Sequence, residues 1–230
     1  MQLIKFQLRL IASKVTIIIF LIASILLTLI YISVILSLDG SDPDYYNRYL
    51  YFYNSSIYFR IIINFISIYL FSHCFSKRCE EASYILIMLK YSRLKIVASR
   101  IISCIIIIFA ISCFSFVSFT GIGLFCDGFF LDAQYINGYI SLVIVAIIFG
   151  LIASILIVVV NNMFTVLSTI ILSIFIGELE GSSEIEKILF FAFPSVNEYG
   201  LPFYGYIHYL FLLCLYFFIL VFIYYNKDIN

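Results

Sequence analysis

Charge, tryptophan and proline are scarce in this sequence. Of its 230 residues only 11% are charged and 64% are hydrophobic, tryptophan is absent, and there are three prolines. Soluble domains contain about 25% charged and about 45–50% apolar residues, so the composition excludes an ordinary soluble domain and predicts an integral membrane protein. The formal net charge is zero, which also excludes a bulk basic surface for nucleic acid.

Motifs for nucleotide hydrolysis and for common catalytic sites are missing as well. The chain contains no G-x-x-x-x-G-K-[ST], H-E-x-x-H, G-x-S-x-G or G-x-G-x-x-G pattern, the signatures of phosphate loops, zinc proteases, serine hydrolases and dinucleotide sites. Its six cysteines include no C-x-x-C pair, and their place in apolar runs indicates packing rather than zinc binding or disulfides. We therefore expect no enzyme activity, and no metal or cofactor held by this chain.

Long apolar runs are what the sequence does contain. A helix needs about 20 apolar residues to cross about 30 Å of hydrocarbon. Val15 to Leu38 is too long for the apolar region of a signal peptide, so we expect a retained helix there. Gly138 to Gly177 is about twice too long for one span, and Asn161-Asn162 is the natural break. Six spans are predicted, at residues 15–38, 57–75, 101–122, 138–160, 163–177 and 206–225.

The fifth predicted span is short, and without it the C-terminus would change sides. Basic residues favour cytoplasmic segments. With six spans and a cytoplasmic N-terminus, 10 of the 13 lysines and arginines lie inside. The external segments are then residues 39–56, 123–137 and 178–205, which carry 10 of the 13 acidic residues. We expect an all-α membrane protein with both termini in the cytoplasm.

Two external segments have distinctive compositions. Residues 39–56 are rich in tyrosine, which suits either the membrane interface or a surface that contacts a substrate. Residues 178–205 combine the apolar run ILFFAF with Pro194, Gly200 and Pro202, which interrupt helices. A re-entrant helical hairpin before the last span is favoured there over a seventh span.

The predicted cytoplasmic loop, residues 76–100, concentrates charge between apolar runs. Acidic Glu80 and Glu81 precede the apolar residues 82–89, and basic residues follow them. This order complements a helix dipole and predicts a short helix that lies on the membrane or docks in a partner's groove. The span interiors are essentially uncharged, with Arg60 and His73 near span ends, so energy for any transport has to come from a cytoplasmic partner.

With these features the chain resembles the permease subunits of ABC-2-type transporters. The first cytoplasmic loop of that family reads acidic-x-x-x-Gly-Thr, a few apolar residues, Pro-x-Ser-Arg and a basic residue that enters the third span. This sequence has Glu80 and Glu81, then LIML, then Tyr91-Ser92-Arg93, with Arg100 before the third span. It departs from the pattern at Ala82-Ser83 and Lys90-Tyr91, which stand near the Gly-Thr and Pro-x positions.

The resemblance implies a single transmembrane domain over residues 1–230, in a bacterial plasma membrane. It implies a permease subunit of an exporter, paired with a second permease chain and with separate ATPase subunits that hold ATP and Mg²⁺. The substrate would be an antimicrobial peptide, a lipid or a drug. The residues expected at the ATPase contact are Glu80, Glu81, Tyr84, Leu86, Leu89, Arg93, Lys95 and Arg100.

Polar residues within the predicted spans are candidates for a translocation path. Ser and Thr also serve helix packing in membranes, so both roles stay open. The candidates are Asn64, Ser103, Ser112, Ser115 and Thr120. The alternative function is a non-transporting immunity or assembly protein that binds its target through the tyrosine-rich external segment.

Overall fold

The computed structural model of this chain describes residues 2–11, 14–38, 44–76, 79, 81, 86–88, 90–125, 132–160, 164–178 and 203–226. All regular structure among these residues is helical, which confirms the all-α prediction. The helices are α1 (Gln2–Ile11), α2 (Lys14–Leu36), α3 (Asp44–Cys74), α5 (Arg93–Gly123), α6 (Ala133–Val160), α7 (Phe164–Glu178) and α9 (Phe203–Asn226).

Five of these helices are long and apolar enough to cross a membrane. The five segments are Lys14–Leu36, Asn47–Cys74, Arg93–Gly123, Ala133–Val160 and Gly205–Asn226. The chain is therefore a multi-pass helical membrane protein. Helix α7 occupies the place of the predicted fifth span, but its 15 residues extend only about 22 Å. The predicted hairpin and the Asn161-Asn162 break lie outside the described residues.

The helices extend beyond the predicted spans. Helix α3 begins at Asp44, so much of the tyrosine-rich segment is helical rather than a connection between helices. Helix α5 begins at Arg93, which moves Arg93 to Arg100 from the predicted loop into a helix. Apolar runs report the thickness of the hydrocarbon, whereas a helix continues into polar residues as long as its backbone bonds are made.

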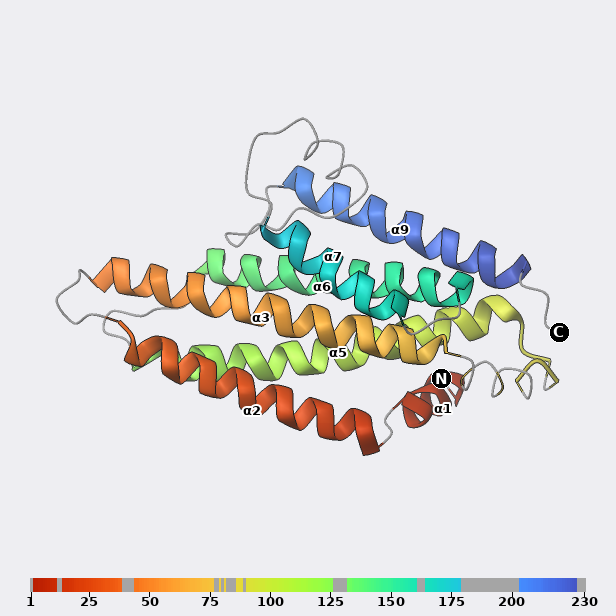
Figure 1. Ribbon diagram of the computed structural model, residues 1–230, viewed down its shortest axis with the longest axis horizontal. Helices are drawn as coiled ribbons and strands as arrows, with labels where there is room; N and C mark the ends of the chain where they lie inside the picture. Colours follow the sequence, from red (N-terminus) through yellow and green to blue (C-terminus); the bar gives the residue numbers. More distant parts are fainter. Residues whose placement is uncertain are drawn as a thin grey trace.

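The long helices run lengthwise through the molecule in alternating directions (Figure 1). One end gathers α1, the start of α2, the end of α3, the start of α5 and the end of α9. We call this the basic end, because most described lysines and arginines belong to it: Lys5, Arg9, Lys14, Lys90, Arg93, Lys95 and Arg100. Within the described ranges, the other basic residues are Arg48 and Arg60 of α3.

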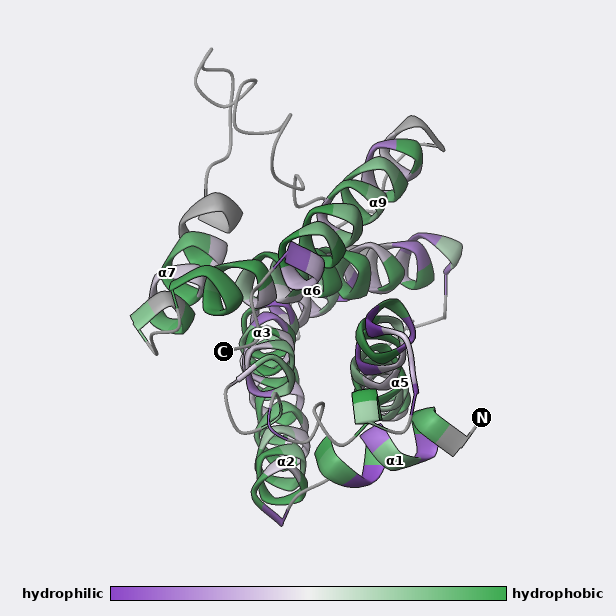
Figure 2. Ribbon diagram, turned by 90° about the vertical axis from the view of Figure 1, so that its right-hand side faces the viewer, coloured by the Kyte–Doolittle hydropathy of each residue, from purple (hydrophilic) through white to green (hydrophobic). Residues whose placement is uncertain are grey.

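Helices α3 and α6 form the centre of the bundle. Seen along the bundle, α2 and α5 lie on one side of this pair and α7 and α9 on the other (Figure 2). Buried residues make up 67% of the apolar window of α6 and 61% of that of α3, against 28% for α2 and 17% for α9. The apolar outer faces of α2 and α9 are therefore the surfaces that lipid would cover.

Small residues allow α3 and α6 to approach closely. Ala146, Gly150 and Ser154 follow one another at intervals of four along α6, and all three are buried. A Cβ atom added to Gly150 would lie 2.6 Å from the Ser67 hydroxyl oxygen and closer still to the Phe71 ring. This is the small-xxx-small packing of membrane helices, and it requires glycine at position 150.

Candidate functional site

The described residues among those predicted to contact an ATPase lie at the basic end but differ in their surroundings. Glu80, Tyr84 and Leu89 lie outside the described residues. Of the others, Glu81 and Lys95 are exposed, Leu86 is buried, Arg93 is half-buried and Arg100 is buried. Only part of the predicted set is therefore available to a partner.

Arg100 joins three parts of the fold. Its side chain is 1% exposed, and its Nη2 donates a hydrogen bond to the backbone oxygen of Cys79. The guanidinium also lies 5.6 Å from the ring centre of Phe75 and 6.0 Å from that of Tyr224. Cation–π contacts of this kind are worth about 2 kcal/mol when water is excluded. Arg100 thus connects α5 with the end of α3 and with α9.

Arg93 makes a second connection to α9. Its Nη1 donates a 2.7 Å hydrogen bond to the backbone oxygen of Tyr225, and its guanidinium lies 5.9 Å from the centre of the Tyr225 ring. The last carbonyls of a helix have no partner within the helix and carry partial negative charge. A cation placed there therefore caps the C-terminus of α9.

Ser92, between Tyr91 and Arg93 in the motif, starts helix α5. Its backbone is extended and its hydroxyl oxygen accepts a 3.4 Å hydrogen bond from the backbone N–H of Lys95. Serine at this position satisfies an N–H that the helix itself leaves without a partner. The Ser-Arg pair of the motif therefore has two structural roles here, a cap for α5 and a cap for α9.

A short helical piece precedes this cap. Residues 86–88 are helical, and the N–H groups of Lys90 and Tyr91 donate to the oxygens of Ile87 (2.9 Å) and Leu86 (3.1 Å). This bond pair is a Schellman motif, in which the residue after the helix is left-handed. Lys90 has a φ of 64°, as that motif requires. The described residues thus contain the C-terminal end of the short helix predicted over residues 82–89.

Five exposed side chains that are charged or large and apolar lie among the described residues from 81 to 95, next in sequence to these structural contacts, and we call this set the end patch. Its described members combine one acid, two bases and two large apolar side chains: Glu81, Met88, Lys90, Leu94 and Lys95. Met88 is 82% exposed and Leu94 55% exposed. Neither residue is among the contact residues expected from the sequence, although large apolar side chains in a charged segment are a signal for a binding surface.

None of the candidate path residues lines the lateral cavity described below. Ser103, Ser112 and Thr120 donate hydrogen bonds to the backbone oxygens of Ser99, Ile108 and Phe116, at 2.7, 2.8 and 3.0 Å. All of these residues belong to α5. Hydroxyls bonded within their own helix need no water, so the packing role suits these three residues.

Ser115 belongs to a polar cluster in the bundle interior. Tyr31 of α2 lies between the Ser115 hydroxyl, at 2.6 Å, and the Tyr139 hydroxyl of α6, at 3.0 Å. Tyr51 of α3 donates a 2.8 Å hydrogen bond to the backbone oxygen of Phe119 and stacks on the Phe119 ring. These contacts join α2, α3, α5 and α6, and no motif in the sequence predicts the pairing.

Asn64 lies on a polar stripe of α3 with Arg60. The two residues are one turn apart, and Ser67, a turn further on, faces Gly150 of α6. The Arg60 side chain is only 5% exposed, and the residue lies well inside α3 (Asp44–Cys74) rather than near the end of a span as expected. Part of the bundle interior is therefore charged.

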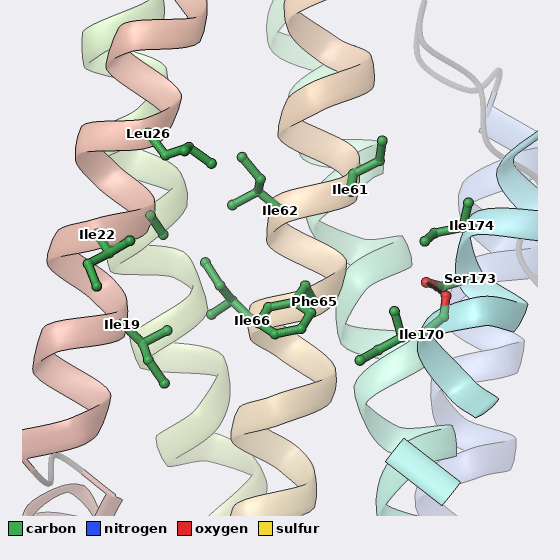
Figure 3. A pocket seen from close by; sticks show the side chains of 11 residues that line it. Ile19, Ile22, Leu26, Ile61, Ile62, Phe65, Ile66, Ile170, Ser173 and Ile174 are labelled. Atoms are coloured by element: carbon green, nitrogen blue, oxygen red, sulfur yellow. Dashed lines mark hydrogen bonds between the residues drawn. The ribbon is translucent and has the colours of Figure 1, made fainter. Parts of the chain in front are cut away.

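A lateral cavity of about 380 Å³ lies between α2, α3 and α7 (Figure 3). Its lining is apolar except for Ser173, whose hydroxyl donates to the backbone oxygen of Ile170 at 2.8 Å. Isoleucines from all three helices point into it, among them Ile22, Ile62 and Ile174. Such a space suits a hydrocarbon chain rather than an ion.

The described residues include no cluster of three or more histidine, cysteine or acidic side chains able to hold a metal. At the basic end, charged and apolar side chains are exposed in the end patch, while Arg93 and Arg100 link α5 to α9. No protein-family model and no curated protein sequence matches this chain.

Proposed function

We propose that this chain is the membrane-spanning permease subunit of an ABC-2-type exporter, as its sequence resemblance implies. In this proposal α7 is the fifth of six spans, residues 178–205 contain the re-entrant hairpin, and both termini are cytoplasmic. The observation that carries the proposal is the gathering of basic residues at the end of the bundle that also holds the end patch. Basic residues favour the cytoplasmic side, where an ATPase would bind.

Energy enters this protein through the end patch. The sequence has no phosphate loop, so ATP and Mg²⁺ are held by a partner subunit. A mixed surface of Glu81, Lys95 and exposed Met88 suits a protein partner, because large apolar side chains bury well while charges set the orientation. Movement of this surface reaches α9 through Arg93 and the end of α3 through Arg100.

The translocation path forms between two permease chains. Three of the candidate path hydroxyls are bonded within α5, which leaves the interior of a single chain poorly suited to a polar route. The apolar cavity between α2, α3 and α7 suits the hydrocarbon part of an amphiphilic substrate. An antimicrobial peptide, a lipid or an apolar drug fits this requirement.

Co-purification tests the coupling surface. The tagged chain is expressed together with any P-loop ATPase that a neighbouring gene encodes, and the double variant Glu81→Lys with Lys95→Glu is compared with the natural sequence. We expect the ATPase to be lost from the variant and kept by Gln134→Lys, a control at the exposed start of α6 at the opposite end. Equal ATPase recovery from all three chains would remove the end patch as the dock.

Labelling tests the orientation independently. Cysteines introduced at Lys90 and at Gln134, in a chain without native cysteines, are treated with a membrane-impermeant maleimide on intact cells. The proposal expects reaction at position 134 and none at position 90. The reverse pattern would place the basic end outside and exclude a cytoplasmic ATPase partner. A non-transporting immunity or assembly protein would then be the better reading.

A further inference from the structure

Two cysteine thiols face one another where α3 ends at the basic end. Cys74 is the last residue of α3, and Cys104 lies eleven residues into α5. Their sulfur atoms are 3.1 Å apart, and the residues are 1% and 0% exposed. A disulfide bond has a sulfur–sulfur length of about 2.0 Å, so a closing movement of about 1 Å separates this contact from a covalent bond.

We propose that Cys74 and Cys104 are a redox-modification site, at which a small peroxide converts the two thiols to an intramolecular disulfide. The sequence predicts that these cysteines are small apolar side chains that pack between helices. Packing alone does not require two sulfur atoms to face one another. No disulfide occurs among the described cysteines, so the thiols stand in the reduced form. The proposal depends on this geometry alone and not on the proposed transport function.

The reaction balances with a peroxide as the oxidant. One thiol sulfur attacks a peroxide oxygen, the O–O bond breaks, and the thiol proton leaves with the other oxygen as water. The resulting sulfenic acid is the reversible first step of cysteine oxidation. The second thiol attacks its sulfur, the S–O bond breaks, and the hydroxyl leaves with the second thiol proton as water. Two thiols are oxidised and one peroxide is reduced to two waters.

Burial determines which reagents can reach the pair. Cys74 and Cys104 are covered by the bundle, whereas Cys113 and Cys214 are exposed on its outer faces. A bulky maleimide cannot reach the buried pair in the folded protein. A molecule the size of hydrogen peroxide enters far more readily, and the second thiol is already in place to resolve the sulfenic acid.

The disulfide would fix the two helices that flank the charged segment. Cys74 precedes Phe75, whose ring lies against Arg100, and Arg100 is one turn before Cys104 on α5. A covalent link there joins the same two elements that the Arg100 contacts already join. Oxidation would therefore restrict movement of the end of α3 relative to α5, next to the end patch.

The test counts accessible thiols after oxidation. Membranes that contain a chain with only Cys74 and Cys104, the other four cysteines replaced by alanine, are treated with hydrogen peroxide. The protein is then unfolded in detergent and labelled with a polyethylene-glycol maleimide. We expect two adducts before oxidation, none after it, and two again when dithiothreitol precedes labelling. In the natural sequence, six adducts should fall to four, which covers the case in which the alanine variant folds poorly.

Two control chains make the result specific. In a chain that keeps Cys74 and Cys113, the second thiol lies nine residues further along α5 than Cys104, about 13 Å along the helix axis. This chain should form no internal disulfide and should keep both adducts. A chain with Cys74 alone should keep its single adduct. Persistence of both adducts in the Cys74–Cys104 chain overturns the proposal. Loss that dithiothreitol does not reverse, or that occurs equally with Cys74 alone, also overturns it.

Discussion

Helix α6 is attached to the bundle in two different ways, through its contact with α3 and through its contact with α9. The α3–α6 contact includes a close approach at Gly150 of α6, which lies against Ser67 and Phe71 in the last third of α3. Helix α9 is the least buried span, although Tyr209 and Leu212 are buried against α6, and polar contacts are found at both of its ends. Tyr206 at one end bonds the oxygen of Asn137 at 3.3 Å and contacts the Ser141 hydroxyl at 3.2 Å, while Arg93 caps the other end.

The difference shows which helix can move. In lipid, apolar surface gains little from burial against another helix, so packing and hydrogen bonds decide the strength of association. A contact like that at Gly150 has one well-packed arrangement and resists sliding. A helix with a small buried share and a polar anchor at each end can shift more easily when one anchor is displaced. We infer that α3 and α6 form the fixed frame and that α9 is the helix that responds to the basic end.

The largest expected effect comes from disturbing the frame. Gly150→Leu places a branched side chain where even a Cβ atom collides with Ser67 and Phe71. Overpacking of this kind costs about 3 kcal/mol, and reversible unfolding in mixed detergent micelles measures it. Gly121→Leu is the matched control, because a Cβ atom there meets nothing within 4 Å. If the two variants unfold alike, the close contact between α3 and α6 is not a determinant of stability.

Loss of Arg100 should come second. Arg100→Met keeps the length of the side chain but leaves the oxygen of Cys79 without its charged donor and removes the contacts to Phe75 and Tyr224. A hydrogen bond from a charged group is worth about 2 kcal/mol, so we expect that loss in the same unfolding assay. Lys95→Met, on the exposed side of the same helix, should change stability by less than about 0.5 kcal/mol.

Apolar runs in the sequence predicted the membrane-crossing helices of this fold but not its other features. They located five helices that can cross a membrane, because hydropathy depends only on neighbouring residues. They did not predict α1, whose ten residues include Lys5 and Arg9 and resemble a polar terminus. They also placed Arg60 near a span end, whereas it is buried well inside α3, because apolar runs state neither where a helix continues into polar residues nor which helices meet.

The candidate site was predictable to the same degree. The segment itself stood out by its charge, and the Ser-Arg pair of its motif stands at the start of α5. The sequence could not predict the hydrogen bond from Arg93 to the backbone oxygen of Tyr225, because the two residues are 132 positions apart. Arg100 and Lys95 are both basic residues in one short helical stretch, yet Arg100 is buried and Lys95 is exposed. The sequence could not predict this difference, because it depends on contacts with distant residues.

A smaller effect is expected at the other anchor of α9. Tyr206→Phe removes the hydroxyl that donates to Asn137 and contacts Ser141. Hydrogen bonds between membrane helices contribute about 0.6 kcal/mol on average, so the free energy of unfolding should fall by about that amount. Tyr225→Phe is the control, since Tyr225 takes part through its backbone oxygen and its side chain is exposed. A fall of equal size in the control would show that the Tyr206 hydroxyl is not an anchor.

The smallest expected effect is a gain, at the turn that leads into the Arg93 anchor. Lys90 is held at φ 64° by the Schellman motif, a left-handed conformation that costs a residue with a Cβ atom about 1 kcal/mol and costs glycine almost nothing. Lys90→Gly should therefore raise the free energy of unfolding by a few tenths of a kcal/mol, because glycine also loses more entropy on folding. Lys90→Ala removes the same charge and keeps the strain, so it should give no gain. Equal stability of the two variants would mean that the charge of Lys90, and not its backbone, determines the turn.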